Sequence, residues 1–389
     1  MLTDLKDWST ASGRVYLNTG HAGPSPNSVI RRIKETLEQE VLLGPASPEA
    51  LDFAERIDME AKCALAALLS ADPAELRLTH GTREGINIVL FGFNWQAGDQ
   101  LIISDLEHSA LKHPAKVLAE RHGVQPVELS IAQPSSPQDI LKTFQSVIGS
   151  KTRLIAFSHV QYGCGLRMPA KEIVQAAHDR GIPVLIDAAQ SVGQMPVDVG
   201  ELGCDFLAVS GQKWLMGPVG TGALYIRDEA RNHLNPLFTT NSIEAKRLRR
   251  RAPLDRFGLV SQNPALVAGL SAAVGHISQI GVARILARIT ELANLLRESL
   301  ELSPATLLSP TDPALSSGLI TVNLPGWSPE NLTNVLAKRF GIIGRTVKHP
   351  AGLRLCTSYF NTEDEIRYVA ESLASLCQTS LPELPTAKQ

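Results

Sequence analysis

Asp187 and Lys213 are the two residues near the middle of this chain whose types could carry chemistry. Asp187 lies in the apolar run 183–190, which is typical of a buried parallel strand, and ligands gather beyond the carboxyl ends of such strands. Lys213 follows in the loop 210–214, where a desolvated lysine can act as an amine nucleophile. Because an aspartate can keep a heterocyclic nitrogen protonated, the pair suits pyridoxal 5′-phosphate (PLP). A structural aspartate and a solvent-facing lysine are the alternative for either residue alone.

Two further positions carry small or polar residues just after expected strands. Gly81 and Thr82 stand between a short strand and a helix, and the N–H groups and dipole of such a helix start favour a phosphate. His108 follows the next strand and could lie over a planar ligand. A helix-capping or core histidine is the alternative.

Strands and helices alternate along most of the chain, which indicates right-handed crossovers and a mainly parallel sheet. Strands are expected at 15–18, 75–79, 100–104, 124–129, 152–158, 183–190 and 220–227. Helices are expected at 27–42, 48–69, 86–91, 109–122, 137–147 and 170–180. The candidate residues of this part all fall at strand ends, and that agreement favours a single site.

The last third of the sequence predicts a smaller α+β domain. A long helical region over 264–302 leads into it, and a capping box at 362–365 opens its last helix. Its other expected elements are strands at 319–323 and 353–357 and a helix at 329–340. We expect a large domain over 26–262, a small domain over 1–25 and 263–385, and a frayed tail over 386–389.

Composition narrows the class of protein. The net charge of −2 gives no reason to expect nucleic acid or a membrane as a partner, and the basic cluster within 239–256 is interpreted as a solvated loop. The N-terminal region lacks the apolar core of a signal peptide, so a cytoplasmic location is expected. Neither disulfides nor a metal site is indicated, because the cysteines are scattered without CxxC spacing: Cys63, Cys164, Cys204, Cys356 and Cys377.

The order of these motifs resembles that of the class V aminotransferases. The motifs are Gly81-Thr82, His108, Asp187 with Gln190, and Ser210 with Lys213. This family includes cysteine desulfurases, isopenicillin N epimerase and cysteine/cystine C-S lyases. The resemblance spans nearly the whole chain and implies an aspartate aminotransferase-like α/β fold (PLP fold type I). Such a fold has a large domain with a mainly parallel, seven-stranded sheet, a smaller α+β domain, and PLP as cofactor.

The resemblance also implies roles for single residues. Lys213 would carry the cofactor and later move protons, and Asp187 would pair with the pyridinium nitrogen. Gln190 would donate a hydrogen bond to the phenolic oxygen, and His108 would stack on the ring face. Gly81, Thr82 and Ser210 would contact the phosphate. The family forms homodimers with shared active sites, so Ser261 of the partner subunit would complete the phosphate contacts.

The substrate side of the resemblance lies elsewhere in the chain. Arg354 matches the arginine that grips the α-carboxylate of an amino-acid substrate, a task suited to a planar bidentate donor. Arg345 is a candidate second carboxylate contact, with a surface arginine as the alternative. Asn18, Thr19 and His21 match the N-terminal substrate loop.

Three departures from the desulfurase pattern bear on the reaction. Gln212 replaces the usual histidine before the lysine, and Gln161 is the candidate substitute for an asparagine near the phenolic oxygen. The loop 344–352, where desulfurases carry their persulfide-forming cysteine, contains none. Cys356 is expected to pack in the core, which leaves Cys164 as a candidate near the cofactor.

These features favour a PLP-dependent lyase that cleaves a C–S bond by β-elimination. Its substrate would be cysteine, cystine or a related S-conjugated amino acid, and its products pyruvate, ammonia and a sulfur species. The alternatives are a class V aminotransferase or epimerase, a cysteine desulfurase, and a non-enzymatic PLP-binding protein. The leaving group and any sulfur-acceptor partner stay open.

Overall fold

The computed structural model describes residues 13–131, 136–237, 254, 257–258, 262–301 and 303–377. They fold as two compact units. Unit 1 contains Gly20–Tyr162 and Arg167–Leu286, and unit 2 contains residues 13–19, Gly163–Leu166 and the chain from Ala287 onwards. The short segment Gly163–Leu166 therefore belongs with the C-terminal part of the chain, which the sequence did not indicate.

The boundary between the units differs from the predicted boundary at 262/263. Helix α9 (Pro264–Ile280) stays with unit 1, because it packs against α1 (Asn27–Leu43) and α2 (Pro48–Leu69). The division falls instead within α10 (Val282–Glu301).

The expected single helical region over 264–302 is two helices. Gly281 separates α9 from α10, and its φ of +89° lies in the region that favours glycine. Within the described residues no single helix is both long and apolar enough to cross a membrane. Helices α9 and α10 taken together, bent by 76° at their junction, would be long and apolar enough by length and composition alone.

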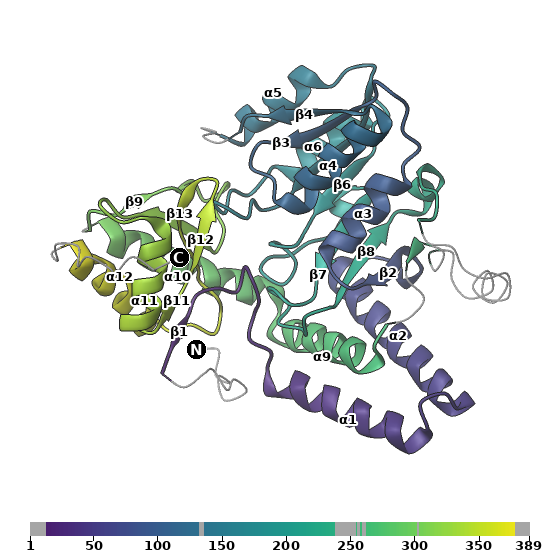
Figure 1. Cartoon of the computed structure of the whole chain (residues 1–389), viewed down its shortest axis with the longest axis horizontal. Coiled ribbons are helices and arrows are strands. Elements are labelled where there is room, and N and C mark those ends of the chain that lie inside the picture. The colour runs from purple at the N-terminus through teal and green to yellow at the C-terminus, as the bar shows by residue number, and fades with distance from the viewer. Residues whose placement is uncertain are drawn as a thin grey trace, which may run out of the picture. The chain divides into compact units, whose positions relative to one another are not determined.

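A seven-stranded sheet forms the centre of unit 1 (Figure 1). Its order is β2 (Leu76–Thr79), β8 (Gly222–Ile226), β7 (Phe206–Ser210), β6 (Val184–Asp187), β5 (Thr152–Ser158), β3 (Gln100–Ser104) and β4 (Gln125–Leu129). Neighbours run parallel except at β8, which is antiparallel to β2 and β7. The predicted mainly parallel sheet is confirmed, although β7 was not recognised as a strand and β6 ends at Asp187 rather than at 190.

Helices and short turns connect these strands. They are α3 (Thr82–Gly92), α4 (Ser109–His122), α5 (Pro137–Val147), α6 (Ala170–His178) and α7 (Val199–Leu202), with 3₁₀ turns at Pro73–Glu75 and Asp228–His233. Apolar side chains of α3 and α4 pack on those of the sheet, and Ile86, Leu111 and Phe206 are fully buried in this core. Burial of the strands on both faces explains their continuous apolar runs.

Unit 2 is the expected α+β structure. Its main sheet has the order β12 (Arg345–Lys348), β13 (Ala351–Cys356), β10 (Leu319–Asn323) and β9 (Thr306–Leu307), and β1 (Val15–Tyr16) pairs with β11 (Ile342–Ile343). Helices α11 (Pro329–Arg339) and α12 (Glu363–Cys377) complete it. The predicted capping box is confirmed, since Glu365 N donates to Thr362 Oγ1 and Thr362 N donates to Glu365 Oε2, both at 3.1 Å.

The segment 344–352 is a β-hairpin rather than a loop. Strands β12 and β13 pair antiparallel from Arg345 opposite Arg354 to Lys348 opposite Ala351. Only His349 and Pro350 remain for the turn. A two-residue connection of this kind leaves no loop that could extend a side chain far from the sheet.

Candidate active site

Asp187 and Lys213 meet at the carboxyl end of the central sheet. Asp187 ends β6 and is 5% exposed. Burial raises the pKa of its carboxyl group, whereas the nearby charge of Lys213 and a hydrogen bond from Ala189 N (2.9 Å) lower it. A buried carboxylate of this kind gains most from a charged donor, so the position suits a protonated ring nitrogen.

Gly222 brings the ends of β2 and β7 together. It pairs with Thr79 on one side and with Ser210 on the other. A Cβ atom at Gly222 would lie 2.7 Å from Gly81 Cα and 2.5 Å from Val209 O, so the absence of a side chain lets these backbones approach.

The start of α3 lies beside this glycine. Thr82 is the first residue of the helix, and its buried Oγ1 makes no hydrogen bond with any described residue. Its side chain and the first N–H groups of α3 are donors that need an acceptor, and Ser210 ends β7 close by. This set fits an anionic group such as a phosphate.

His108 caps helix α4. Its Nδ1 accepts a hydrogen bond from Ala110 N at 3.1 Å, so the ring proton lies on Nε2. The ring of Tyr162 meets the imidazole edge-on, with centroids 4.8 Å apart and planes at 84°. The capping interpretation of His108 is therefore confirmed, and stacking on a ligand, which capping does not prevent, stays a prediction.

Gln190 is held at both ends of its amide. Trp214 Nε1 donates to Gln190 Oε1 at 2.8 Å, and Gln190 Nε2 donates to the carbonyl oxygen of Gly20 at 2.8 Å. An amide nitrogen has two N–H groups, so one remains for a further acceptor. The predicted bond to a phenolic oxygen would use that second N–H group.

The N-terminal loop packs on the lysine segment. Gly23 N donates to the carbonyl oxygen of Gln212 at 2.7 Å, and a Cβ atom at Gly23 would lie 2.3 Å from Lys213 O. His21 lies between the two anchored glycines, Gly20 and Gly23, and is exposed. The close approach explains why the loop is built from small residues.

The predicted carboxylate-binding residues gather in unit 2. Arg345 and Arg354 are directly opposite in the β12–β13 pair, so their side chains leave the same face of the sheet. Arg354 is 2% exposed. Asn18 bridges to Cys356 two residues further along β13, and Asn18 Oδ1 and Thr19 Oγ1 are buried without a hydrogen bond to any described residue. Two like charges on one face suit an anionic ligand.

The predicted set thus divides between the units, with the cofactor residues in unit 1 and all the substrate residues except His21 in unit 2. Ser261 lies outside the described residues. Sequence reasoning missed Tyr162, Trp214 and Glu107. Only the positions of Trp214 and Glu107, next to Lys213 and His108, could have drawn attention to them.

Comparisons with known proteins agree with this arrangement. The model of the family "Aminotransferase class-V" matches residues 15–369. Isopenicillin N epimerase of Streptomyces clavuligerus is 30% identical, with 96% of this chain and 99% of that protein covered. A probable cysteine desulfurase of Methanothermobacter thermautotrophicus is 28% identical over 93% of this chain and 94% of that protein.

Solved structures of the cystine C-S lyase C-DES have the same fold. Its complex with the reaction product cysteine persulfide has a TM-score of 0.86 at 25% identity, covering 93% of this chain and 98% of that one. A C-DES mutant with glycine covalently linked to the PLP cofactor has a TM-score of 0.87 at 24% identity, covering 95% and 99%. From the family match and the site geometry together, the chain belongs to the class V aminotransferases, with pyridoxal 5′-phosphate as its cofactor.

Proposed function

We propose that this chain is a lyase that cleaves a C–S bond by β-elimination in cysteine, cystine or a related S-conjugated amino acid. The products would be pyruvate, ammonia and a sulfur species. The hairpin β12–β13 carries the proposal, because the segment in which desulfurases hold their nucleophilic thiol is here a short turn of His349 and Pro350. With no thiol there to accept the sulfur atom, sulfur has to depart with the leaving group.

The cysteines elsewhere support this choice. Cys356 is fully buried in β13, where its N–H donates to the carbonyl oxygen of Leu17 at 2.8 Å. Cys204 is also fully buried, and burial raises the pKa of its thiol to about 12. Cys164 is 5% exposed, and the exposed Cys63 lies on α2. A sulfur-accepting cysteine needs an accessible thiolate, which Cys204 and Cys356 do not offer.

Lys213 and Asp187 would carry the proton chemistry. When bound, PLP supplies the electron sink that makes the α-carbon acidic. Lys213, as a neutral amine, would take the proton from the α-carbon, and Asp187 would keep the ring nitrogen protonated. The charge of Lys213 already acts on Asp187 in this structure, which supports their assignment to one site.

The remaining residues of unit 1 would hold and orient the cofactor. Thr82 Oγ1, Ser210 and the N–H groups at the start of α3, next to Gly81, would bind the phosphate, completed by Ser261 of the partner subunit. His108 would cover the ring face, and the second N–H group of Gln190 would reach the phenolic oxygen. Gln212 would offer an uncharged contact where desulfurases have a histidine.

Residues of unit 2 would select the substrate. Arg354 would grip the α-carboxylate through paired N–H donors, and Arg345 on the same face would add a second contact. The buried oxygens of Asn18 and Thr19 would offer hydrogen-bonding partners to the substrate. His21, an exposed residue of unit 1, would be a further substrate contact.

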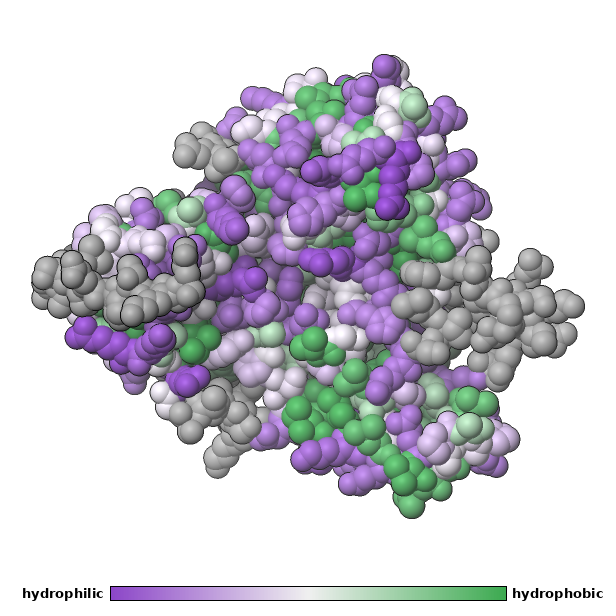
Figure 2. Space-filling view, viewed as in Figure 1, coloured by the Kyte–Doolittle hydropathy of each residue, from purple (hydrophilic) through white to green (hydrophobic). Residues whose placement is uncertain are grey.

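We propose that the enzyme is a homodimer and that the partner is a second copy of this chain. Exposed apolar side chains on α1 and α2 support this assignment, and Figure 2 shows apolar surface over α1. These side chains are Ile30, Leu37, Val41, Leu42, Leu51 and Met59. Light scattering should show a dimer that Val41→Asp weakens, whereas the control Tyr368→Asp, at an exposed apolar side chain of α12, should not. A monomeric parent protein would refute the shared site.

The decisive test incubates holoenzyme with cystine or cysteine in the absence of a keto-acid acceptor and measures pyruvate and sulfide. We expect pyruvate from the parent, from Cys164→Ser and from Cys356→Ser at similar rates, and none from Lys213→Ala. Alanine formed in place of pyruvate by the parent, and lost in either cysteine variant, would indicate desulfurase chemistry, because transfer of sulfur to an enzyme thiol leaves alanine. Borohydride reduction and peptide mapping should place the cofactor on Lys213, and labelling elsewhere would refute the assignment of the lysine.

Epimerisation is the second candidate function. The 30% identity to isopenicillin N epimerase over nearly the full length of both proteins favours it. Transamination needs the same Asp187 and Lys213 and belongs to the same alternative. Chiral chromatography of each amino acid after incubation separates these outcomes. An epimerase changes the configuration of the amino acid, a transaminase acts on it only when a keto-acid acceptor is present, and a lyase consumes the amino acid without an acceptor.

A further inference from the structure

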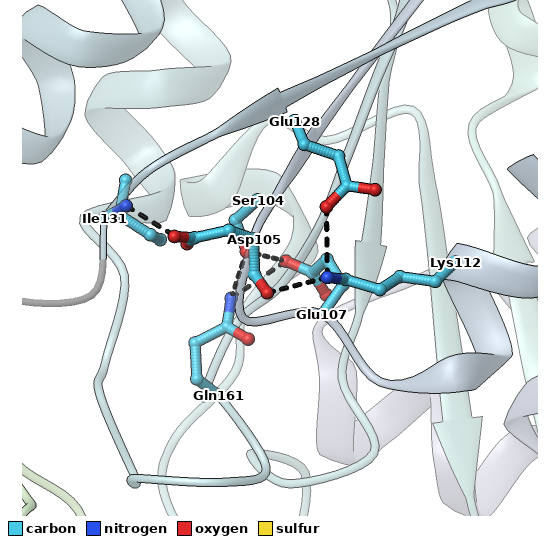
Figure 3. Close-up of polar contacts among 7 residues, drawn as sticks. All are labelled: Ser104, Asp105, Glu107, Lys112, Glu128, Ile131 and Gln161. Atoms are coloured by element: carbon cyan, nitrogen blue, oxygen red, sulfur yellow. Dashed lines mark hydrogen bonds and ion pairs between the residues drawn. The ribbon is translucent and has the colours of Figure 1, made fainter. Parts of the chain in front are cut away.

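Glu107 is a buried carboxylate in the turn that follows β3, directly before His108. It is 3% exposed, and it accepts hydrogen bonds from three residues in two segments of the chain. Its Oε1 accepts from Ser104 Oγ at 2.6 Å and from Gln161 Nε2 at 2.8 Å. Its Oε2 accepts from Ser158 N at 3.0 Å and from Ser158 Oγ at 2.5 Å. Figure 3 shows the polar ends of Ser104, Glu107 and Gln161 converging on one another.

All of these groups donate their hydrogen bonds to the Glu107 carboxylate. Gln161 Nε2 also donates to Ser104 Oγ at 3.1 Å, so the groups form a closed network in the core. The lysine in this region, Lys112, instead donates to Asp105 O at 2.8 Å and Glu128 Oε2 at 3.0 Å. Burial raises the pKa of the Glu107 carboxyl group, and the hydrogen bonds oppose that shift. Each Glu107 oxygen has two donors, whereas Gln161 Oε1 is buried without a hydrogen bond to any described residue. The satisfied carboxylate holds the three donor residues around it in one arrangement.

Two residues of this network are each followed in the sequence by a residue with a ring side chain. Glu107 is followed by His108, and Gln161 is followed by Tyr162. The inner pair is hydrogen-bonded at 2.8 Å, and the outer rings meet edge-on with centroids 4.8 Å apart. Because neighbouring residues share a peptide plane, movement of the inner pair would displace the outer pair.

We propose that Glu107 is a positioning residue that sets the placement of His108 against Tyr162, and through them the shape of the cofactor site. The inference rests on the role proposed for His108 but not on the reaction catalysed. In this proposal Tyr162 lines the cofactor site through its contact with His108. Gln161 connects Glu107 to Tyr162 and does not contact the cofactor itself.

Glu107→Gln is the informative substitution. An amide keeps the volume but has only one acceptor atom, so the donors that now face one of the oxygens would face an N–H group instead. The matched control is Glu128→Gln, which removes a carboxylate that is half exposed and bonded to Lys112. A control for stability alone is Phe144→Leu, at a fully buried ring that packs on Phe157 with centroids 5.7 Å apart.

The readouts are the visible circular dichroism of bound PLP and its release rate from the holoenzyme. We expect Glu107→Gln to weaken the dichroic band and speed release by about tenfold, the effect of losing one buried charged hydrogen bond. Both controls should keep the parental band and rate. If Glu107→Gln loses stability as Phe144→Leu does but keeps band and rate, Glu107 is structural and the inference is wrong.

A double substitution tests the route through the rings. Tyr162→Phe should keep the band because the ring remains, and Glu107→Gln should add little to Tyr162→Leu. If Glu107→Gln changes the band and the release rate as much in Tyr162→Leu as in the parent, Glu107 does not act through the His108–Tyr162 pair and the inference is wrong. His108→Ala separates the two proposals: an unchanged band refutes the stacking role and this inference with it. A changed band together with an unaffected Glu107→Gln refutes only the inference.

Discussion

Trp214 Nε1 donates a hydrogen bond to Gln190 Oε1 at 2.8 Å, which ties the residue after Lys213 to the residue three places beyond Asp187. Both side chains are buried, at 1% and 4% exposure. An indole N–H can only donate, so it fixes which end of the Gln190 amide is oxygen. The amide nitrogen is thereby turned towards Gly20, and its second N–H group is the one that we propose for the contact with the cofactor.

Trp214→Phe should therefore disturb the cofactor and not only the core. The substitution leaves Gln190 Oε1 buried without its donor, at a cost of about 1–3 kcal/mol, and allows the amide to rotate. We expect a shifted absorption band of bound PLP and faster loss of the cofactor. Trp95→Phe is the control, because its Nε1 donates to a backbone carbonyl, that of Leu90, at 2.6 Å. Equal spectra for Trp214→Phe and the parent would contradict the prediction.

Gly222→Ala should abolish retention of PLP. The added Cβ atom would lie 2.7 Å from Gly81 Cα, so the start of α3 has to move away from Ser210. Gly275→Ala in α9 is the matched control, since nothing lies within 4 Å of its Cβ position. The control should stabilise the protein by about 0.5–1 kcal/mol because alanine favours helix. Equilibrium dialysis against PLP measures the difference, and normal affinity of Gly222→Ala would exclude a tight cradle.

Arg354→Lys should raise KM for amino acids that carry a free carboxylate by about 10-fold to 100-fold, the range expected for one charge-assisted hydrogen bond. The lysine keeps the charge but loses the planar pair of donors. The same change at Arg345 should have a smaller effect, because Arg345 is less buried than Arg354. Amino-acid amides are the control substrates. If KM for an amide rises as much as KM for the acid, Arg354 does not bind the carboxylate.

Stability should fall on the acid side because of His159. Burial, helped by the charge of Arg167, lowers the pKa of this histidine from 6.5 to about 4. The unfolded chain therefore takes up a proton below pH 6.5 that the folded chain refuses until about pH 4. The free energy of unfolding should decrease as the pH falls through this window, on the order of 3 kcal/mol in total. Urea titrations of the parent and of His159→Gln measure it, and a variant with an equally steep acid limb would disprove the assignment.

Much of the fold was accessible from sequence because its signals are local. Helices at Ser109–His122 and Pro137–Val147 and the strand Thr152–Ser158 match their expected bounds. Strand β7 was missed although Phe206–Ser210 is as long as the predicted strand Gln100–Ser104. The hairpin at Arg345–Cys356 was missed because its pairing depends on register between two strands and no local residue pattern specifies that register.

The sequence by itself determined the family and the cofactor, because the order and spacing of motif residues at strand ends can be read along one dimension. Only the tertiary structure decided which atoms those residues turn towards each other. The proton of His108 is placed by the cap of α4, the amide of Gln190 by Trp214, and the rings of His108 and Tyr162 lie in front of Glu107 and Gln161. Apart from the local cap of His108, these relationships join residues distant in sequence, and directional hydrogen bonds between such residues exist only once the strands have assembled.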